Sequence, residues 1–118
     1  MAGSIDGATL RDWMSRGADF CLVDTLPHDV YARHHIPGAI SIVSDEIETR
    51  APVRLPERDR TVVVYCTSER CRRSEKAAAR LERLGYRDVR EYVEGRRDWE
   101  DAGYPVESGA DPEAAGGA

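Results

Sequence analysis

The sequence predicts an α/β fold, with a small parallel sheet of about five strands flanked by helices on both faces. Short apolar runs rich in β-branched residues alternate along the chain with segments of helical spacing. Parallel strands need crossover connections, which are usually helices, so this alternation indicates a parallel sheet. The chain has 118 residues, which is enough for one such domain and too few for two.

The N-terminal segment predicts a helix that covers the sheet. Asp6 is suited to cap this helix, and Leu10, Trp13 and Met14 recur at the spacing of one helical face. Gly17 is suited to the turn that ends it.

An apolar run at residues 20–24 predicts a central strand. Its last residue, Asp24, is expected at the carboxyl edge of the sheet, where ligands of α/β proteins bind. Cys21 lies inside this run and is interpreted as a small core residue, since free cysteines are among the most buried side chains.

The middle of the chain predicts a short helix, a turn and a second strand. Pro27 suits the first turn of the helix, and Ile-Pro-Gly at residues 36–38 predicts a turn before a strand at 39–43. Residues 44–60 are largely polar and contain two prolines. We therefore expect a surface excursion there, with one short helix at 45–49.

The second half of the chain predicts strand, helix, strand and helix in that order. The run at 61–65 favours a buried strand, and residues 74–84 predict a helix with one apolar stripe that Gly85 ends. A short strand at 88–92 and a last helix at 97–102 follow.

The end of the chain differs in composition from the rest. Residues 108–118 are rich in small and acidic side chains and lack the bulky apolar groups that offset the entropy of ordering. We therefore expect a domain at residues 1–107 and a mobile tail at 108–118.

Composition argues against several classes of protein. Hydrophobic residues make up 41% of the chain, and no apolar stretch approaches the length that a membrane helix requires. The net charge of −5 argues against general nucleic-acid binding. The three cysteines have no zinc-site spacing and predict free thiols. With no secretory signal at the N-terminus, we expect a cytoplasmic protein.

Cys66 is the candidate nucleophile. It follows the strand at 61–65 and opens a loop that leads into the next predicted helix. The helix N-terminus and the nearby Arg70, Arg72 and Arg73 would favour a thiolate, so we expect a lowered pKa at Cys66. The same arginines, in an acidic chain, favour a small anionic substrate.

Three separated groups of residues resemble the signatures of the single-domain rhodanese-like sulfurtransferases, in the family's order and over residues 5–106. The first group has an acid-ended strand and an HIPGA turn, the second surrounds the active-site cysteine, and the third closes the domain. They are Leu22-Val23-Asp24, Tyr31 and His35-Ile36-Pro37-Gly38-Ala39; Tyr65-Cys66, Ser74 to Leu81 and Gly85-Tyr86; and Gly95, Trp99 and Ala102 to Val106.

This resemblance implies that Cys66 accepts a sulfane sulfur from thiosulfate or a persulfide donor and passes it to a thiol or to cyanide. The partners would be a small anionic sulfur donor and a thiol acceptor, and this transfer would need no metal or organic cofactor. Asp24, His35 and Ser74 match supporting positions. The loop that would bind the substrate consists of Thr67, Ser68, Glu69, Arg70, Cys71, Arg72 and Arg73.

The loop departs from the usual family pattern. It is about two residues longer and contains no glycine, so a cradle of its backbone amides must have a different shape. Elsewhere, Leu26 and His34 replace a common arginine and a common glycine. The arrangement of Cys66, Cys71 and Ser74 resembles a subgroup with a Cys-x4-Cys-x2-Ser loop.

Three alternatives remain open. Cys71 is either a resolving or regulatory thiol, as in a redox-sensing protein, or a structural residue at the helix–sheet junction. The spacing from Cys66 to Arg72 also fits the Cys-x5-Arg loop of cysteine phosphatases and some arsenate reductases, although Tyr65 replaces the histidine usual there. The third alternative is a partner-binding module without turnover.

Overall fold

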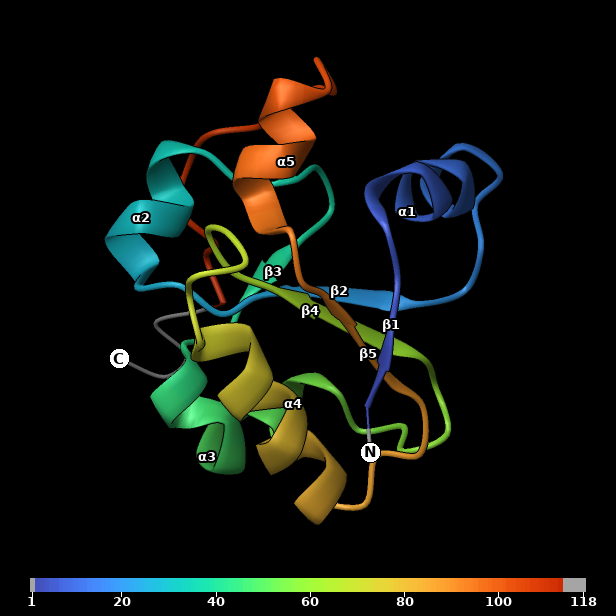
Figure 1. Cartoon of the computed structure of the whole chain (residues 1–118). Coiled ribbons are helices and arrows are strands. Elements are labelled where there is room, and N and C mark those ends of the chain that lie inside the picture. The colour runs from blue at the N-terminus through green and yellow to red at the C-terminus, as the bar shows by residue number, and fades with distance from the viewer. Residues whose placement is uncertain (1, 114–118) are drawn as a thin grey trace.

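Five parallel strands form one sheet in the order β1-β5-β4-β2-β3, with helices on both faces, so the predicted fold class is confirmed (Figure 1). The computed structural model describes residues 2–113. The strands are β1 (Gly3–Ser4), β2 (Cys21–Asp24), β3 (Ile40–Ser41), β4 (Val62–Tyr65) and β5 (Val89–Tyr92). The helices are α1 (Gly7–Ser15), α2 (His28–Arg33), α3 (Ile47–Arg54), α4 (Arg73–Arg83) and α5 (Gly95–Asp101), with a 3₁₀ turn, η1 (Ser44–Glu46), before α3.

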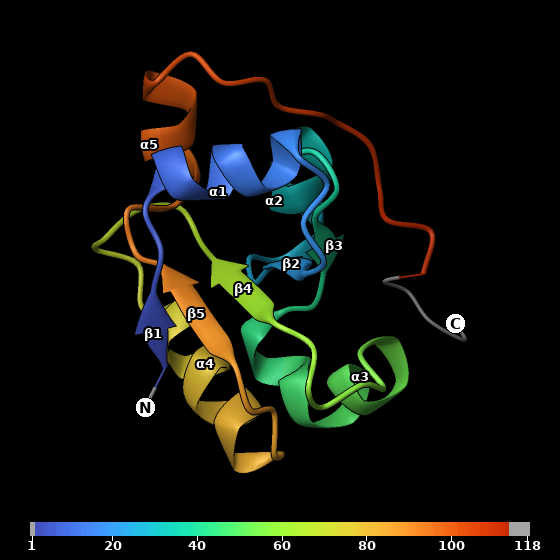
Figure 2. The same cartoon turned by 90° about the vertical axis from the view of Figure 1, so that its right-hand side faces the viewer.

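Alternate residues of the central strand β4 build two cores. Val62 and Val64 belong to the core under α3 and α4, whereas Val63 and Tyr65 belong to the core under α1, α2 and α5. Figure 2 shows these two groups of helices on opposite sides of the sheet. All four side chains of β4 are fully buried, as expected for a strand covered on both faces.

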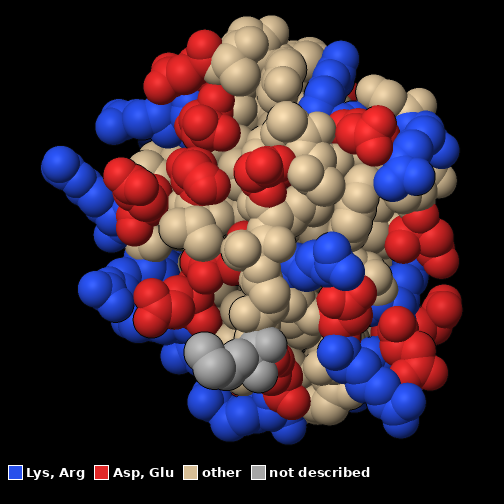
Figure 3. All heavy atoms as spheres, turned by 45° about the vertical axis from the view of Figure 1, so that its right-hand side comes forward, with Lys and Arg blue, Asp and Glu red and all other residues tan. Residues whose placement is uncertain are grey.

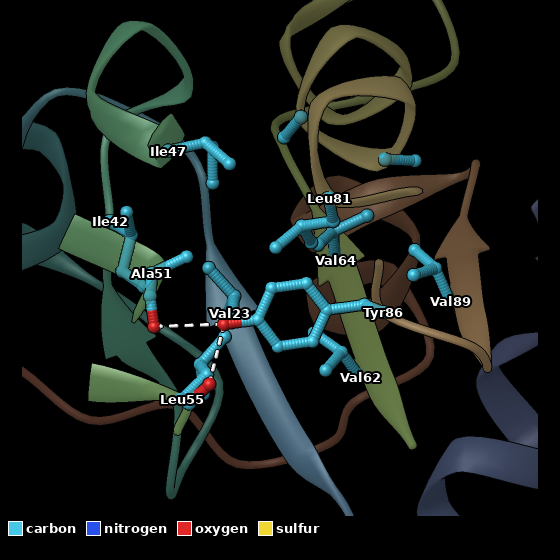
Figure 4. Packing of buried hydrophobic residues seen from close by; sticks show 12 residues of the cluster. Val23, Ile42, Ile47, Ala51, Leu55, Val62, Val64, Leu81, Tyr86 and Val89 are labelled. Carbon is cyan, nitrogen blue, oxygen red and sulfur yellow. Dashed lines mark hydrogen bonds between the residues drawn. The ribbon is translucent and has the colours of Figure 1, made fainter. Parts of the chain in front are cut away.

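Tyr86 is the polar centre of the core under α3 and α4 (Figure 4). Its ring packs among aliphatic side chains, and its hydroxyl donates to the backbone carbonyls of Ala51 and Leu55 at the end of α3. Arg58 donates to the same hydroxyl at 2.9 Å. Tyr86 therefore joins the end of α3 to the segment after α4.

Most of the predicted elements are confirmed. The Asp6 side chain accepts a hydrogen bond from the Thr9 N–H at 2.8 Å, as an N-cap does, and Leu10 is fully buried. The helix predicted at 74–84 runs one residue earlier at each end. The two-residue strand β1 was not predicted, because nothing apolar marks Gly3 and Ser4.

The predicted surface excursion at 44–60 is wrong. Helix α3 is longer than the expected helix, and Ile47, Ala51 and Leu55 lie fully or almost fully in the core. These residues recur every fourth position, and that weak stripe is enough to bury one helical face. Pro52 removes the hydrogen bond to the Glu48 carbonyl, but Glu48 is exposed, so water can replace it.

Residues beyond 107 contact the body of the domain. The Gly109 N–H donates to the Ala32 carbonyl at 2.7 Å. Asp111 accepts from Arg54 Nη1 at 2.7 Å and from the Ser41 N–H at 2.9 Å. The boundary at 107 and the mobility of the tail stay predictions, and residues 114–118 lie outside the described range.

Candidate active site

Cys66 lies directly after β4, at the carboxyl edge of the sheet, and is 1% exposed. The loop that follows leads to Arg73, the first residue of α4. Residues Glu69 and Arg70 form its exposed tip. The predicted order of strand, cysteine, loop and helix is confirmed.

The Cys66 sulfur lies among oxygen atoms. It is 3.3 Å from the Cys71 carbonyl, 3.3 Å from Ser74 Oγ and 4.0 Å from the Ser68 carbonyl. Ser74 is almost fully buried in the first turn of α4. The structure therefore brings together Cys66, Cys71 and Ser74, which the Cys-x4-Cys-x2-Ser spacing had grouped.

Glu91 is a further member of the site that the sequence interpretation missed. Ser74 Oγ donates to Glu91 Oε2 at 2.7 Å. Glu91 lies on β5 in register with Val64 of β4, on the same side of β5 as Val89, which packs against α4. Alternation along residues 88–92, with Val89 inward, was the signal that could have placed this carboxylate under α4.

Burial raises the pKa of the Cys66 thiol from 9.0 to about 11. The neighbouring Cys71 raises the pKa further, and hydrogen bonding of Cys66 with the side chain and backbone of Ser74 opposes both effects. The expected lowering of this pKa is therefore wrong.

The arginines do not offset this burial. Among residues 2–113, none of Arg70, Arg72 and Arg73 forms a hydrogen bond with the Cys66 sulfur, and Arg72 instead pairs with Glu75 at 3.4 Å. Both side chains of that pair are more than 60% exposed, so the charge of Arg72 is screened by water.

The loop presents carbonyl groups to the sulfur in this conformation. The Cys71 N–H donates to the Ser68 carbonyl at 3.0 Å, and the Arg70 N–H donates to Ser68 Oγ at 3.4 Å. Two amides of the expected cradle are thus used within the loop. Binding of an anion by these amides stays a prediction, and it requires the loop to rearrange.

The N-terminus of α5 holds the base of the loop. The N–H groups of Arg96 and Arg97 donate to the carbonyls of Cys66 and Thr67, each at 2.9 Å. Gly95 has a φ of 74°, and a Cβ there would lie 2.6 Å from the Cys66 carbonyl oxygen. Glycine is required at this position because the two backbones approach so closely.

Asp24 and Tyr65 form a second polar network. Asp24 is fully buried, accepts from the Leu26 N–H at 2.9 Å and from the Tyr65 hydroxyl at 2.8 Å, and has a pKa raised by burial. The Tyr65 hydroxyl also accepts from the Ile36 N–H at 3.0 Å. This network fixes the turn at residues 36–38 to the sheet.

His35 is placed beside the same turn. Its Nδ1 lies 2.8 Å from the Tyr31 carbonyl, and its ring stacks on the Tyr31 ring at 3.8 Å. Its backbone pairs with Glu107. Among the described residues, neither Asp24 nor His35 forms a hydrogen bond with the Cys66 sulfur, so both lie outside the immediate surroundings of the thiol.

The family model described as "Rhodanese-like domain" matches residues 6–102. The chain belongs to the rhodanese-like family. This rhodanese-like domain is 35% identical, over 111 residues, to the HTH-type transcriptional regulator Rv0324 of Mycobacterium tuberculosis, with 92% of this chain and 48% of that protein covered. It is 33% identical, over 67 residues, to the thiosulfate sulfurtransferase PspE of Escherichia coli, with 57% of this chain and 62% of that protein covered. The domain thus spans between 48% and 62% of these two relatives.

Solved structures support the same family. The crystal structure of the BH2092 protein from Bacillus halodurans superposes with a TM-score of 0.84 at 30% identity, covering 91% of the rhodanese-like domain and 77% of that chain. Membership of the Cys-x4-Cys-x2-Ser subgroup stays a prediction. Within residues 2–113, no helix combines the length and the hydropathy that crossing a bilayer demands.

Proposed function

We propose that this rhodanese-like domain is a sulfurtransferase that carries sulfane sulfur as a persulfide on Cys66. This proposal rests on the position of Cys66. The residue lies between a central buried strand and the N-terminus of an 11-residue helix. Backbone N–H groups of α5 bind the carbonyls of Cys66 and Thr67 at the start of the following loop. The name of the E. coli relative, a thiosulfate sulfurtransferase, supports the choice of donor.

The proposed reaction has two displacements. The Cys66 sulfur attacks the outer sulfur of thiosulfate, a new S–S bond forms, and sulfite leaves with the electron pair of the broken bond. An acceptor thiol or cyanide then takes the outer sulfur from the persulfide and releases Cys66. The helix N-terminus and the loop amides would stabilise the anions, and no metal or organic cofactor takes part in this scheme.

The loop has to open in this scheme. Cys66 is 1% exposed and carbonyl groups face its sulfur, so a donor reaches it only when residues 67–72 move away. Glu69 and Arg70 form the exposed tip of this loop. Its movement would also free the Cys71 N–H to bind an anion.

A second candidate function is redox sensing by Cys66 and Cys71. Cys71 lies close enough to share a hydrogen bond with the Cys66 thiol, and all three cysteines of the described chain are free. An oxidant could therefore join the two sulfurs in a disulfide. The match covers 48% of the M. tuberculosis protein, which is a transcriptional regulator. This relative supports the proposal of a sensing or partner-binding module.

The phosphatase alternative has less support. Arg72 would have to wrap around a tetrahedral anion, but it is 75% exposed and pairs with Glu75.

Mass spectrometry after thiosulfate treatment tests the proposal, using wild type, Cys66→Ser and Cys71→Ser. We expect the wild type and Cys71→Ser to gain one sulfur atom and Cys66→Ser to gain none. A disulfide between Cys66 and Cys71, with no persulfide from any donor, would favour redox sensing. Turnover of a phosphate ester without sulfur transfer would overturn both.

A further inference from the structure

Three side chains form a continuous chain of hydrogen bonds at the site. They come from the start of the loop after β4, from α4 and from β5. Cys66 Sγ lies 3.3 Å from Ser74 Oγ, and Ser74 Oγ lies 2.7 Å from Glu91 Oε2. An ionised carboxylate only accepts hydrogen bonds, so the Ser74 hydroxyl donates to Glu91. The Ser74 oxygen is then free to accept from the Cys66 S–H.

We propose that Ser74 and Glu91 form a proton relay that removes the proton from Cys66 when it attacks the sulfur donor. This inference rests on the proposed sulfurtransferase function and adds Glu91 to its machinery. Ser74 touches the reacting sulfur, whereas Glu91 acts through Ser74 as a positioning residue and final proton acceptor.

The proton balance of the relay is simple. The S–H proton passes to Ser74 Oγ while the Ser74 O–H proton passes to Glu91 Oε2. The sulfur is left as a thiolate that accepts from the Ser74 hydroxyl, and the neutral Glu91 donates to Ser74. The thiolate then forms the S–S bond to the donor, sulfite leaves, and Glu91 returns its proton to water or to sulfite.

Charge favours this route over the loss of a proton to water. A thiol buried this deeply does not ionise readily at neutral pH, and a bound dianion such as thiosulfate makes an additional negative charge still more costly. Transfer within the relay leaves the total charge of the site unchanged. A bound anion therefore raises the electrostatic cost of proton transfer to Glu91 less than it raises the cost of proton loss to water.

The surroundings of Glu91 leave its carboxylate available for this role. Among residues 2–113, Glu91 forms no ion pair with a lysine or arginine, including Arg73 and Lys76 on the facing helix α4. Its carboxylate contacts Ser74 of α4, which lies beside Cys66. The Ile5 N–H, just after β1, binds the backbone carbonyl of Glu91 at 3.1 Å. Glu91 is half-buried, so its proton can exchange with solvent after each turnover.

The rate of persulfide formation between pH 6 and pH 8 tests the relay. The wild-type rate should change little over this range, because the Cys66 proton passes into the relay and does not have to be lost to water. In Glu91→Gln the rate should be at least about tenfold lower at pH 7 and rise about tenfold per pH unit, since only thiolate formed by loss of a proton to water reacts. Ser74→Ala should behave like Glu91→Gln, and Ser74→Thr, which keeps a hydroxyl, should recover the wild-type profile.

A purely electrostatic role of Glu91 predicts the opposite sign. Removal of a negative charge beside an anionic donor would make Glu91→Gln faster than the wild type, and that result would overturn the relay. Glu75→Gln is the matched control, because it removes an exposed carboxylate one residue from Ser74 and leaves the Ser74–Glu91 contact intact.

Alkylation of Cys66 by iodoacetamide, followed by peptide mass spectrometry, separates this inference from the proposed function. Slower alkylation of Glu91→Gln at pH 7 would support the relay even if no persulfide formed in the wild type. Persulfide formation and alkylation with the same pH profile in wild type and Glu91→Gln would overturn the relay and leave the sulfurtransferase function standing.

Discussion

Two chains of hydrogen bonds lie at the carboxyl edge of the sheet, one on each face, and we expect them to differ in what they do. One joins Cys66, Ser74 and Glu91 on the face covered by α4. The other joins the Ile36 N–H, Tyr65 and Asp24 on the opposite face. Each ends on a carboxylate, but Asp24 is fully buried whereas Glu91 is half-buried.

In the proposed relay, the exposure of the carboxylate is what separates the Cys66–Ser74–Glu91 network from the structural network at Asp24. Burial and the Asp24 charge raise the pKa of Tyr65 well above its usual value, so its proton stays in place and fixes a turn. Glu91 instead contacts solvent and can exchange a proton. Variants of the Ile36–Tyr65–Asp24 network should change the free energy of unfolding most. Variants of the Cys66–Ser74–Glu91 network should change the rate of sulfur transfer most.

Tyr65→Phe should have the largest effect on stability. It removes the hydroxyl that donates to Asp24 and accepts from Ile36, leaving two buried groups without that partner. The free energy of unfolding, measured in urea, should fall by about 2 to 4 kcal/mol. Tyr104→Phe is the control, because within residues 2–113 the Tyr104 hydroxyl forms no hydrogen bond; equal losses in both variants would contradict the comparison.

The Cys66 thiol should make stability depend on pH in the alkaline range. Its folded pKa of about 11 lies above the ordinary value of 9.0, so its contribution is fully present below pH 9 and is lost as the pH rises through 11. Between pH 8.5 and pH 10.5, wild type should lose about 1 to 2 kcal/mol more than Cys66→Ser in urea unfolding. Parallel losses in the two proteins would show that the folded thiol is not protected from ionisation.

Ser74→Ala should cost less stability than Tyr65→Phe, even though we expect it to slow the chemistry more. The Glu91 carboxylate is half-buried and can take water in place of the lost hydroxyl. We expect a loss of about 1 kcal/mol in urea unfolding. If Ser74→Ala lowered the free energy of unfolding as much as Tyr65→Phe does, the Cys66–Ser74–Glu91 network would have a structural role as well.

Arg72→Ala should have the smallest effect. Its ion pair with Glu75 is exposed, so the free energy of unfolding should change by less than about 0.5 kcal/mol. Urea unfolding at low and at high salt checks this expectation. A loss above 1 kcal/mol that disappears at high salt would mean that this arginine does act on the fold through its charge.

Local patterns accounted for much of the fold and for the position of Cys66 between a strand and a helix. The β-branched run before Cys66 and the apolar stripe of α4 are strong signals over a few turns of chain, and both elements lie where they were expected. The two-residue strand β1 has no such signal, because it depends on pairing with β5. The burial of α3 depends likewise on packing against α4 and on Tyr86.

The chemistry of the site was less predictable for the same reason. Arginines close to Cys66 in sequence suggested a lowered pKa, but side chains on a loop can point to water, as Arg72 does. The burial that raises the pKa comes from surrounding elements rather than from the loop sequence. Glu91 lies 25 residues after Cys66, and only the register of β4 and β5 and the hydrogen bond to Ser74 connect it to the site.

The contact between Arg54 and Asp111 bears on where this domain can be cut or joined to another. Both side chains are less than 10% exposed, and Arg54 reaches the Ser41 carbonyl on the edge strand β3 as well. A chain shortened to residue 107 would lose the Asp111 carboxylate together with the segment that lies against Arg54, so we expect it to be less stable than a chain that ends at residue 113. Fusion partners and affinity tags therefore belong after residue 113, where this ion pair is preserved.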